Sequence, residues 1–288
     1  FFKDESSVKR KANAPNILVI VTDDLGKYEV SAYGAEHIST PNIDRLGAEG
    51  VIFNEGYVTA PTCAPSRCGI MTGRVQNRYG FETQVMEFYP TNMVEYLSGK
   101  YFVNTGDFVV ESKPHFPTEW QVVKQGVPPT EITLAERLKA MGYTTGIVGK
   151  WHLGISKYNL PMNRGFDYQY GFNGASSLYT PERNWSHIVN YEHQSFSTQY
   201  QWNMGRYGEA AINENGKEVI EEKYLTYAFR DKAIEYIEEN KNEPFFLYLA
   251  FNAPHIPFQA PIDYYCKYEH IEDENKRVYY SMISCLDD

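Results

Sequence analysis

The sequence has few cysteines, with four among 288 residues. This number is too small for a disulfide scaffold of the kind that stabilises small secreted domains. The count does not reveal the redox compartment, because one disulfide or none would both fit it.

The sequence also lacks a basic excess, a long apolar run and an initiator methionine. Its formal net charge is −10, which disfavours a nucleic-acid-binding surface, because phosphate binding needs a basic footprint. An anionic substrate would need positive charge confined to a pocket. No apolar run is long enough to span a bilayer, and we find no internal repeat. The first residue is Phe1, so we interpret the chain as processed or partial, with no signal peptide visible in it.

The composition is that of an ordinary globular protein, 42% hydrophobic and 22% charged. The length is ample for one large α/β core. Aromatic residues make up 15% of the chain and include 24 tyrosines. Tyrosine suits carbohydrate-like ligands through its ring face and hydroxyl, and it suits half-buried packing positions equally well.

Strand and helix patterns alternate along the sequence. Residues 16–22, NILVIVT, are a continuous β-branched run that predicts a central parallel strand buried on both faces. The alternation predicts an α/β fold with a mostly parallel central sheet and helices on both faces. We expect helices at 40–50, 133–142 and 223–240, strands at 16–22, 51–57, 143–148 and 245–251, long loops at 75–128 and 173–222, and a flexible lead-in at 1–14.

Polar side chains follow three of the predicted strands, and they should converge because ligands bind beyond the carboxyl ends of parallel strands. Asp23 and Asp24 fit a hard divalent metal, or alternatively a helix cap and a turn. Lys150 and His152 would point to one side of an extended segment and face one anion, or else be a surface lysine and a packed histidine. His255 lies between two prolines and fits either an oriented site residue or a structural one.

The most specific segment is CAPSR at residues 63–67, followed by CGIMTGR at 68–74. It resembles the signature of the formylglycine-dependent sulfatase family, C-x-P-S-R with a downstream T-G-R. In that family a dedicated enzyme oxidises the cysteine to formylglycine. Taken alone, Cys63 would also fit a buried structural cysteine before a helix.

The resemblance extends from Asn16 to Asp288 and implies the alkaline-phosphatase-like sulfatase fold. Its matching blocks are 16–26, 39–53, GKWHLG at 149–154 and APHIP at 253–257. The resemblance implies one Ca²⁺, with Mg²⁺ as the alternative, bound by Asp23, Asp24 and the modified Cys63. It implies that Arg67 holds the formylglycine, that Lys150, His152 and His255 contact the sulfate group, and that Ser176 is a further sulfate contact.

The implied reaction is hydrolysis of a carbohydrate or aryl sulfate monoester. One hydroxyl of the aldehyde hydrate attacks sulfur, the alcohol leaves, and the second hydroxyl then expels sulfate. The metal, Arg67 and Lys150 offset negative charge, while His152 acts as the base and His255 protonates the leaving oxygen. We expect Lys150 and His255 to be exposed pocket residues whose replacement barely affects stability.

The family completes its metal site with a later acidic/Asn pair and a further lysine, whereas Asp287–Asp288 resemble a Leu-Asp-Asp segment that opens a helix. We therefore expect residues 15–288 to be the N-terminal portion of the catalytic domain. The resemblance also implies a sulfatase-maturing enzyme as partner and a secreted, periplasmic or lysosomal location. If Cys63 is converted, at most one disulfide can form among Cys68, Cys266 and Cys285.

Two other functions stay open at this point. The first is a formylglycine-dependent phosphonate or phosphodiester hydrolase of the same superfamily. The second is a non-catalytic sulfoglycan-binding relative that kept the fold.

Overall fold

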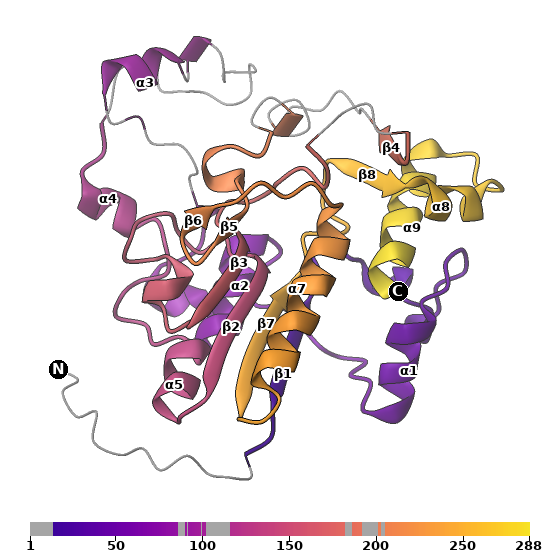
Figure 1. Ribbon diagram of the computed structural model, residues 1–288, viewed down its shortest axis with the longest axis horizontal. Helices are drawn as coiled ribbons and strands as arrows, with labels where there is room; N and C mark the ends of the chain where they lie inside the picture. The colour runs from indigo at the N-terminus through magenta and orange to yellow at the C-terminus, as the bar shows by residue number, and fades with distance from the viewer. Residues whose placement is uncertain are drawn as a thin grey trace.

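The computed structural model describes residues 14–85, 90, 92–98, 100–101, 116–181, 186–191, 201–202 and 205–288. The predicted lead-in lies outside the described residues except for Ala14. The central layer is a six-stranded sheet with the order β1-β7-β2-β3-β5-β6 (Figure 1). Its parallel strands are β1 (Ile17–Val21), β7 (Phe245–Ala250), β2 (Thr144–Lys150) and β3 (Tyr168–Phe172), and its antiparallel strands are β5 (Asn213–Glu214) and β6 (Lys217–Glu218).

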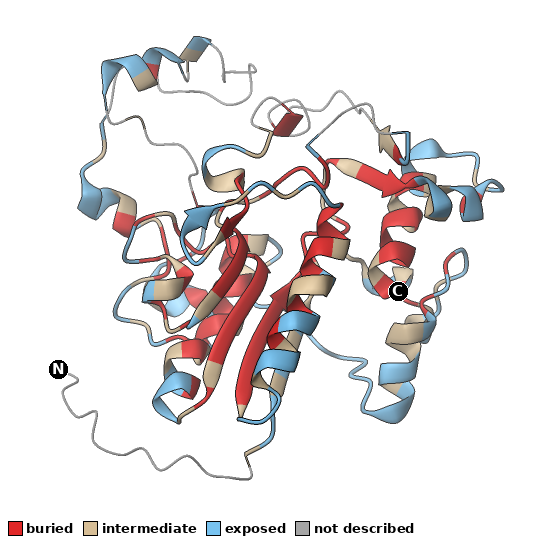
Figure 2. Cartoon of the chain, viewed as in Figure 1, coloured by how far each residue is buried: buried red, intermediate tan, exposed pale blue. Residues whose placement is uncertain are grey.

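Helices cover both faces of this sheet, as predicted. Helix α7 (Leu225–Asn240) packs on one face, where its apolar side chains join Leu247 and Leu249 of β7 in one core cluster. Helices α2 (Cys63–Thr72) and α5 (Leu134–Ala140) pack on the other face with Phe246 and Tyr248. Alternate side chains of β7 therefore point into two different cores. Figure 2 shows the sheet strands between these helices as largely buried.

Strand β1 forms where predicted, but it is an edge strand and not a central one. Among the described residues it pairs with β7 alone, and Leu18 and Ile20 are 44% and 49% exposed. Ile20 lines an apolar groove of about 230 Å³ together with residues of α7 and the C-terminal helix α9 (Glu274–Asp287). The local β-branched pattern identified the strand correctly, but strand order depends on long-range pairing that a single run does not encode.

Several other elements differ from the predictions. Residues 51–57 are described and contain no strand, with Val51, Phe53 and Tyr57 between 72% and 84% exposed. The predicted loops at 75–128 and 173–222 contain short elements in their described parts. The strands and α-helices that sequence patterns missed are α2, α3 (Met93–Ser98), α4 (Glu119–Val123), β3, the antiparallel pair β4 (Ile188–Tyr191) and β8 (Phe258–Pro261), β5, β6, α8 (Ile262–Tyr265) and α9.

The predicted helices at 40–50 and 133–142 are present as α1 (Pro41–Glu49) and α5, and the capping box of Thr133 and Glu136 is formed. The cap of α1 comes from elsewhere in the chain. The Asp287 carboxylate accepts hydrogen bonds from the backbone N–H groups of Asn42 (3.1 Å) and Ile43 (2.8 Å). Asp287 thus caps α1 from within α9, and because α9 begins at Glu274, the expectation that this segment opens a helix is wrong.

Candidate active site

Cys63 is the first residue of α2, and its side chain lies between two polar groups. Its Sγ is 3.3 Å from Nδ1 of His152 and 3.2 Å from Nε2 of Gln84. Cys68 and Met71 of the same helix are fully buried, which fixes the helix against the sheet and turns Cys63 toward the partly exposed side. All four cysteines carry free thiols.

Lys150 is the last residue of β2 and is fully buried. The preceding Gly149 has a φ of +113°, and a Cβ there would lie 2.0 Å from the carbonyl oxygen of Ala250. Only glycine allows β2 to pass this close to β7 and deliver Lys150 to the carboxyl edge of the sheet. The Lys150 Nζ lies 2.5 Å from Oδ2 of Asp23. The expectation that Lys150 is an exposed pocket residue is wrong, because its charge is compensated inside the protein.

Asp23 follows β1 and connects the two cations of the site. Its Oδ2 contacts Lys150, and its Oδ1 lies 3.2 Å from Nη2 of Arg67. Its backbone N–H donates to the carbonyl of Ala253 (3.0 Å), which ties the end of β1 to the segment after β7. Burial disfavours the charged carboxylate, but Lys150 and Arg67 outweigh this effect and hold the pKa of Asp23 well below its usual range. The three side chains together carry one net positive charge.

His152 lies between this cluster and Cys63. Its φ is +56°, so the extended-segment argument that paired it with Lys150 does not hold. Its backbone N–H donates to the carbonyl of Asn173 (3.1 Å), and its side chain is buried. Burial, Lys150 and Arg67 all lower the pKa of His152 well below its ordinary value, so the ring is neutral at pH 7. Within the described residues, its Nε2 has no hydrogen-bond partner.

Asp24 and His255 form the outer, more exposed part of the same site. The Nε2 of His255 is 3.6 Å from Oδ2 of Asp24, and their side chains are 15% and 61% exposed. The His255 Nδ1 is held at 2.6 Å from the carbonyl of Ile256. Tyr179 donates to the carbonyl of His255 (2.8 Å) and Tyr279 to that of Asp24 (3.0 Å), which anchors both backbones. Burial and Lys150 lower the pKa of His255.

The structure therefore brings seven of the eight predicted site residues into direct contacts: Cys63 with His152, Asp23 with Lys150 and Arg67, and Asp24 with His255. The eighth, Ser176, lies beyond the carboxyl end of β3 and is 8% exposed. Gln84, which touches Cys63, was not predicted. It falls in the aromatic-rich stretch interpreted as a long loop, where no local pattern marks it.

The donor types at the carboxyl edge fit a hard divalent cation. Asp23 and Asp24 are consecutive carboxylates, and oxygen donors are what Ca²⁺ and Mg²⁺ prefer. In the described part of the chain no group of three or more His, Cys, Asp or Glu side chains is arranged to hold a metal. A cation here would therefore need further oxygen ligands besides these two residues and the side chain at position 63.

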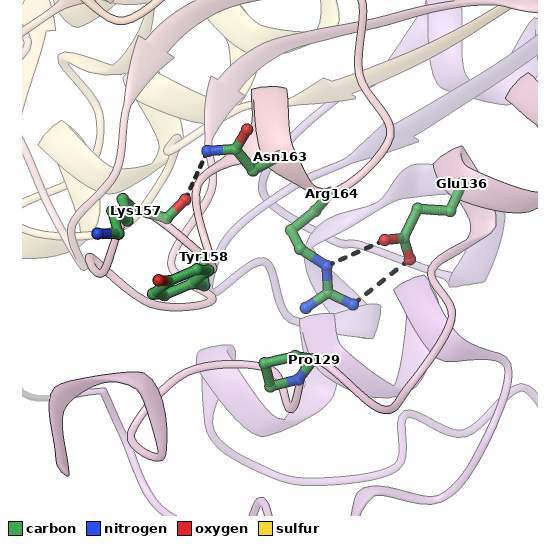
Figure 3. Close-up of a pocket in the computed structure, with 6 residues that line it drawn as sticks. All are labelled: Pro129, Glu136, Lys157, Tyr158, Asn163 and Arg164. Atoms are coloured by element: carbon green, nitrogen blue, oxygen red, sulfur yellow. Dashed lines mark hydrogen bonds and ion pairs between the residues drawn. The ribbon is translucent and has the colours of Figure 1, made fainter. Parts of the chain in front are cut away.

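A separate cavity of about 370 Å³ lies under the loop that follows His152 (Figure 3). Its central Arg164 is 2% exposed, pairs with Glu136 at 3.3 Å and donates to the carbonyl of Val127 (3.0 Å). These bonds join the loop to the start of α5, so we interpret the pair as structural. The cavity is lined by Pro129, Glu136, Lys157, Tyr158, Asn163 and Arg164.

The described residues contain no helix long and apolar enough to cross a membrane.

Residues 15–288 match the family model described as Sulfatase. An arylsulfatase from Hemicentrotus pulcherrimus is 33% identical over 258 residues, covering 88% of this chain and 39% of that protein. The N-acetylgalactosamine-6-sulfatase of Homo sapiens is 33% identical over 249 residues, covering 85% of this chain and 40% of that protein. The chain thus spans about 40% of the length of these curated relatives.

Solved structures show the same likeness. The crystal structure of Ps i-CgsB in complex with k-i-k-neocarrahexaose is 32% identical with a TM-score of 0.69, covering 95% of this chain and 52% of that one. A protein in complex with its substrate D-glucosamine-2-N,6-O-disulfate is 26% identical with a TM-score of 0.57, covering 89% of this chain and 38% of that one. The predicted α/β architecture, a mostly parallel sheet between helices, is therefore confirmed together with its alkaline-phosphatase-like fold.

Proposed function

The chain belongs to the sulfatase family, and from this premise we propose that the protein hydrolyses sulfate monoesters, with Cys63 as the precursor of the nucleophile. The observation that carries the proposal is the position of Cys63. Its sulfur is 3.3 Å from the buried neutral ring of His152. The charges of the ion-paired cluster of Lys150, Arg67 and Asp23 act on that ring. A nucleophile, a base and fixed positive charge are the groups that ester hydrolysis needs.

Electrostatics supports an anionic substrate despite the net charge of −10. A sulfate monoester would be repelled by the acidic chain as a whole but attracted to a local excess of positive charge. Lys150 and Arg67 bring two cations to the site and Asp23 cancels one of them. Because these side chains are buried and fixed by ion pairs, they need no reorganisation when charge develops on the reacting group.

Conversion of Cys63 to formylglycine would supply a hydrate with two hydroxyl groups in place of one thiol. His152 is suited to accept a proton from that side chain, because its ring is neutral and its Nδ1 already faces position 63. His255 lies on the outer side of the site beside Asp24. Burial and Lys150 lower its pKa, so it must first take up a proton, which Asp23 and Asp24 favour, before it can protonate a departing alcohol oxygen. Arg67 donates to the carbonyl of Lys150 (2.8 Å), and this bond couples α2 to the end of β2.

We assign Asp23, Asp24 and the side chain of residue 63 to a divalent cation, with Ca²⁺ preferred to Mg²⁺. Such an ion would add positive charge next to the nucleophile and orient it. Removing the metal with a chelator should abolish turnover, and calcium should restore it. Full turnover in a metal-free preparation would show that the reaction does not need the ion.

As substrate class we propose sulfated carbohydrates. Support comes from similarity to an N-acetylgalactosamine-6-sulfatase and to structures with a neocarrahexaose and a sulfated glucosamine bound. A dedicated sulfatase-maturing enzyme is the partner that this function requires. A secreted, periplasmic or lysosomal location stays a prediction, which fractionation of the native cell would test.

The experiment compares sulfate and phosphate esters of one leaving group, together with carrageenan oligosaccharides and N-acetylgalactosamine-6-sulfate. We expect sulfate release to exceed phosphate release, and Cys63→Ala to abolish it. Preference for phosphate or phosphonate esters would favour the alternative hydrolase. Glycan binding by a chain with an unconverted Cys63 and no turnover would favour the non-catalytic relative.

A further inference from the structure

Gln84 makes three contacts that connect the start of α2 to the reactive side chain, and in one of them the Cys63 Sγ donates to its Oε1 at 3.6 Å. Its Oε1 accepts a hydrogen bond from the backbone N–H of Ala64 (3.2 Å), and its Nε2 donates to Sγ of Cys63 (3.2 Å). The amide therefore bridges the main chain of one residue and the side chain of its neighbour. The Gln84 side chain itself is exposed, so it lies on the solvent side of Cys63.

The contact with Ala64 has a clear structural cause. The first turn of a helix leaves its N–H groups without partners inside the helix. In α2 the N-cap residue Thr62 makes no side-chain cap, and Pro65 has no N–H. Gln84 supplies the missing acceptor from outside the helix. Its neighbours Phe81 and Val85 are each 5% exposed and pack in the same core cluster as α2, so the segment that carries the amide is anchored.

The contact with Cys63 is not needed for this cap, because the cap uses only the oxygen of the amide. The nitrogen lies 3.2 Å from Sγ, and the Nδ1 of His152 is 3.3 Å from the same atom. The sulfur thus contacts both an imidazole nitrogen and an amide nitrogen, and the amide nitrogen can only donate. In the converted protein the oxygens borne by the side chain of residue 63 would take the place of this sulfur.

We propose that Gln84 is a positioning residue: its anchored amide holds the side chain of residue 63 toward His152 and covers its solvent side. This inference rests on the proposed function for its effect on turnover. It goes beyond that function by assigning a role to a residue outside the signature. The contacts also predict that a substitution can remove the hydrogen-bond donor of Gln84 while its side chain still covers residue 63.

The test uses the full chain, matured in a competent host, with conversion at residue 63 quantified by mass spectrometry. Gln84→Glu keeps the length and the acceptor for Ala64 but loses the donor. Gln84→Ala loses donor, acceptor and cover. Thr83→Glu adds the same charge at the adjacent exposed residue and leaves the amide intact, so it is the matched control. Two rates are measured for each variant: sulfate release with its kcat and KM, and oxime formation at residue 63 with a small aminooxy reagent.

Relative to Thr83→Glu, we expect Gln84→Glu to lose about ten-fold in kcat with little change in KM, the scale of one lost hydrogen bond. Its oxime formation should match that of the wild type, because the cover is kept. Gln84→Ala should lose at least as much kcat while oxime formation becomes several-fold faster. A purely structural defect would not move the two rates in opposite directions.

Equal kcat for Gln84→Glu and Thr83→Glu would overturn the proposal, as would unchanged oxime formation in Gln84→Ala. If the wild type carries the aldehyde but releases no sulfate from any ester, the proposed function fails. The role of Gln84 is then decided by oxime formation alone: faster labelling of Gln84→Ala supports it, and equal labelling refutes it.

Discussion

Replacing Lys150 by methionine should destabilise the fold as well as impair the site. Lys150 is 0% exposed and its Nζ is 2.5 Å from an Asp23 carboxylate that is 5% exposed. Breaking a buried pair by removing one partner costs about 3–5 kcal/mol, because the remaining charge is left uncompensated. Here Arg67 stays on the other oxygen at 3.2 Å, so we expect a smaller loss, about 2–3 kcal/mol. For a chain of this size that corresponds to a melting temperature lower by about 5–10 °C.

The assay is thermal unfolding in the presence of a chelator, so that only the chain's own cations compensate Asp23. The matched control is Lys139→Met, which breaks an ion pair of similar length with Asp167 (2.6 Å) whose side chains are 48% and 36% exposed. Exposed pairs contribute about 0–1 kcal/mol, so the control should barely shift the transition. If Lys150→Met melts within about 1 °C of Lys139→Met, the reasoning about the buried cluster is wrong. Turnover of Lys150→Met should fall about 100-fold, the scale of a lost charge-stabilising group.

Three further outcomes follow from the contacts. Asp287→Ala should lower the free energy of unfolding by about 1–2 kcal/mol, because the α1 cap is lost. The control Asp288→Ala, at an exposed position, should change the free energy of unfolding little. Equal unfolding midpoints for the two variants would contradict this prediction. Burial raises the pKa of Cys68 to about 11, so its thiol stays protonated at pH 8, and peptide mapping after iodoacetamide should find exposed Cys266 alkylated and Cys68 protected until the protein is denatured. Asp24→Ala should weaken calcium binding measured by calorimetry and lower turnover in the same preparation, and loss of only one of the two would argue against Asp24 as a ligand.

The sequence predicted that Asp23, Lys150 and His255 lie close together, because each is marked by a local pattern, its position at the end of an apolar strand. Asp23 and His255 follow apolar strands and Lys150 ends one, and parallel strands end at one edge of the sheet. The capping box of α5 and the amphipathic spacing of α7 are also local patterns, and both helices form as expected.

What the sequence did not predict depends on contacts between distant segments. The run that forms β1 has the composition of a central strand, but in the part of the chain that the structure describes it pairs with β7 and with no other strand. The pattern at 51–57 suits a strand that finds no partner among the described residues. The cap of α1 comes from a residue 245 positions away, and a charged side chain such as Lys150 gives no local sign that it will be fully buried.

The most direct test of the central claim is mass spectrometry of the peptide that contains Cys63, isolated from a host with an active sulfatase-maturing enzyme. The account predicts an aldehyde or its hydrate at this position, and none in protein from a host that lacks the enzyme. A free thiol alone in the competent host, in protein that still releases sulfate from its esters, would contradict the assignment of Cys63 as the precursor of the nucleophile.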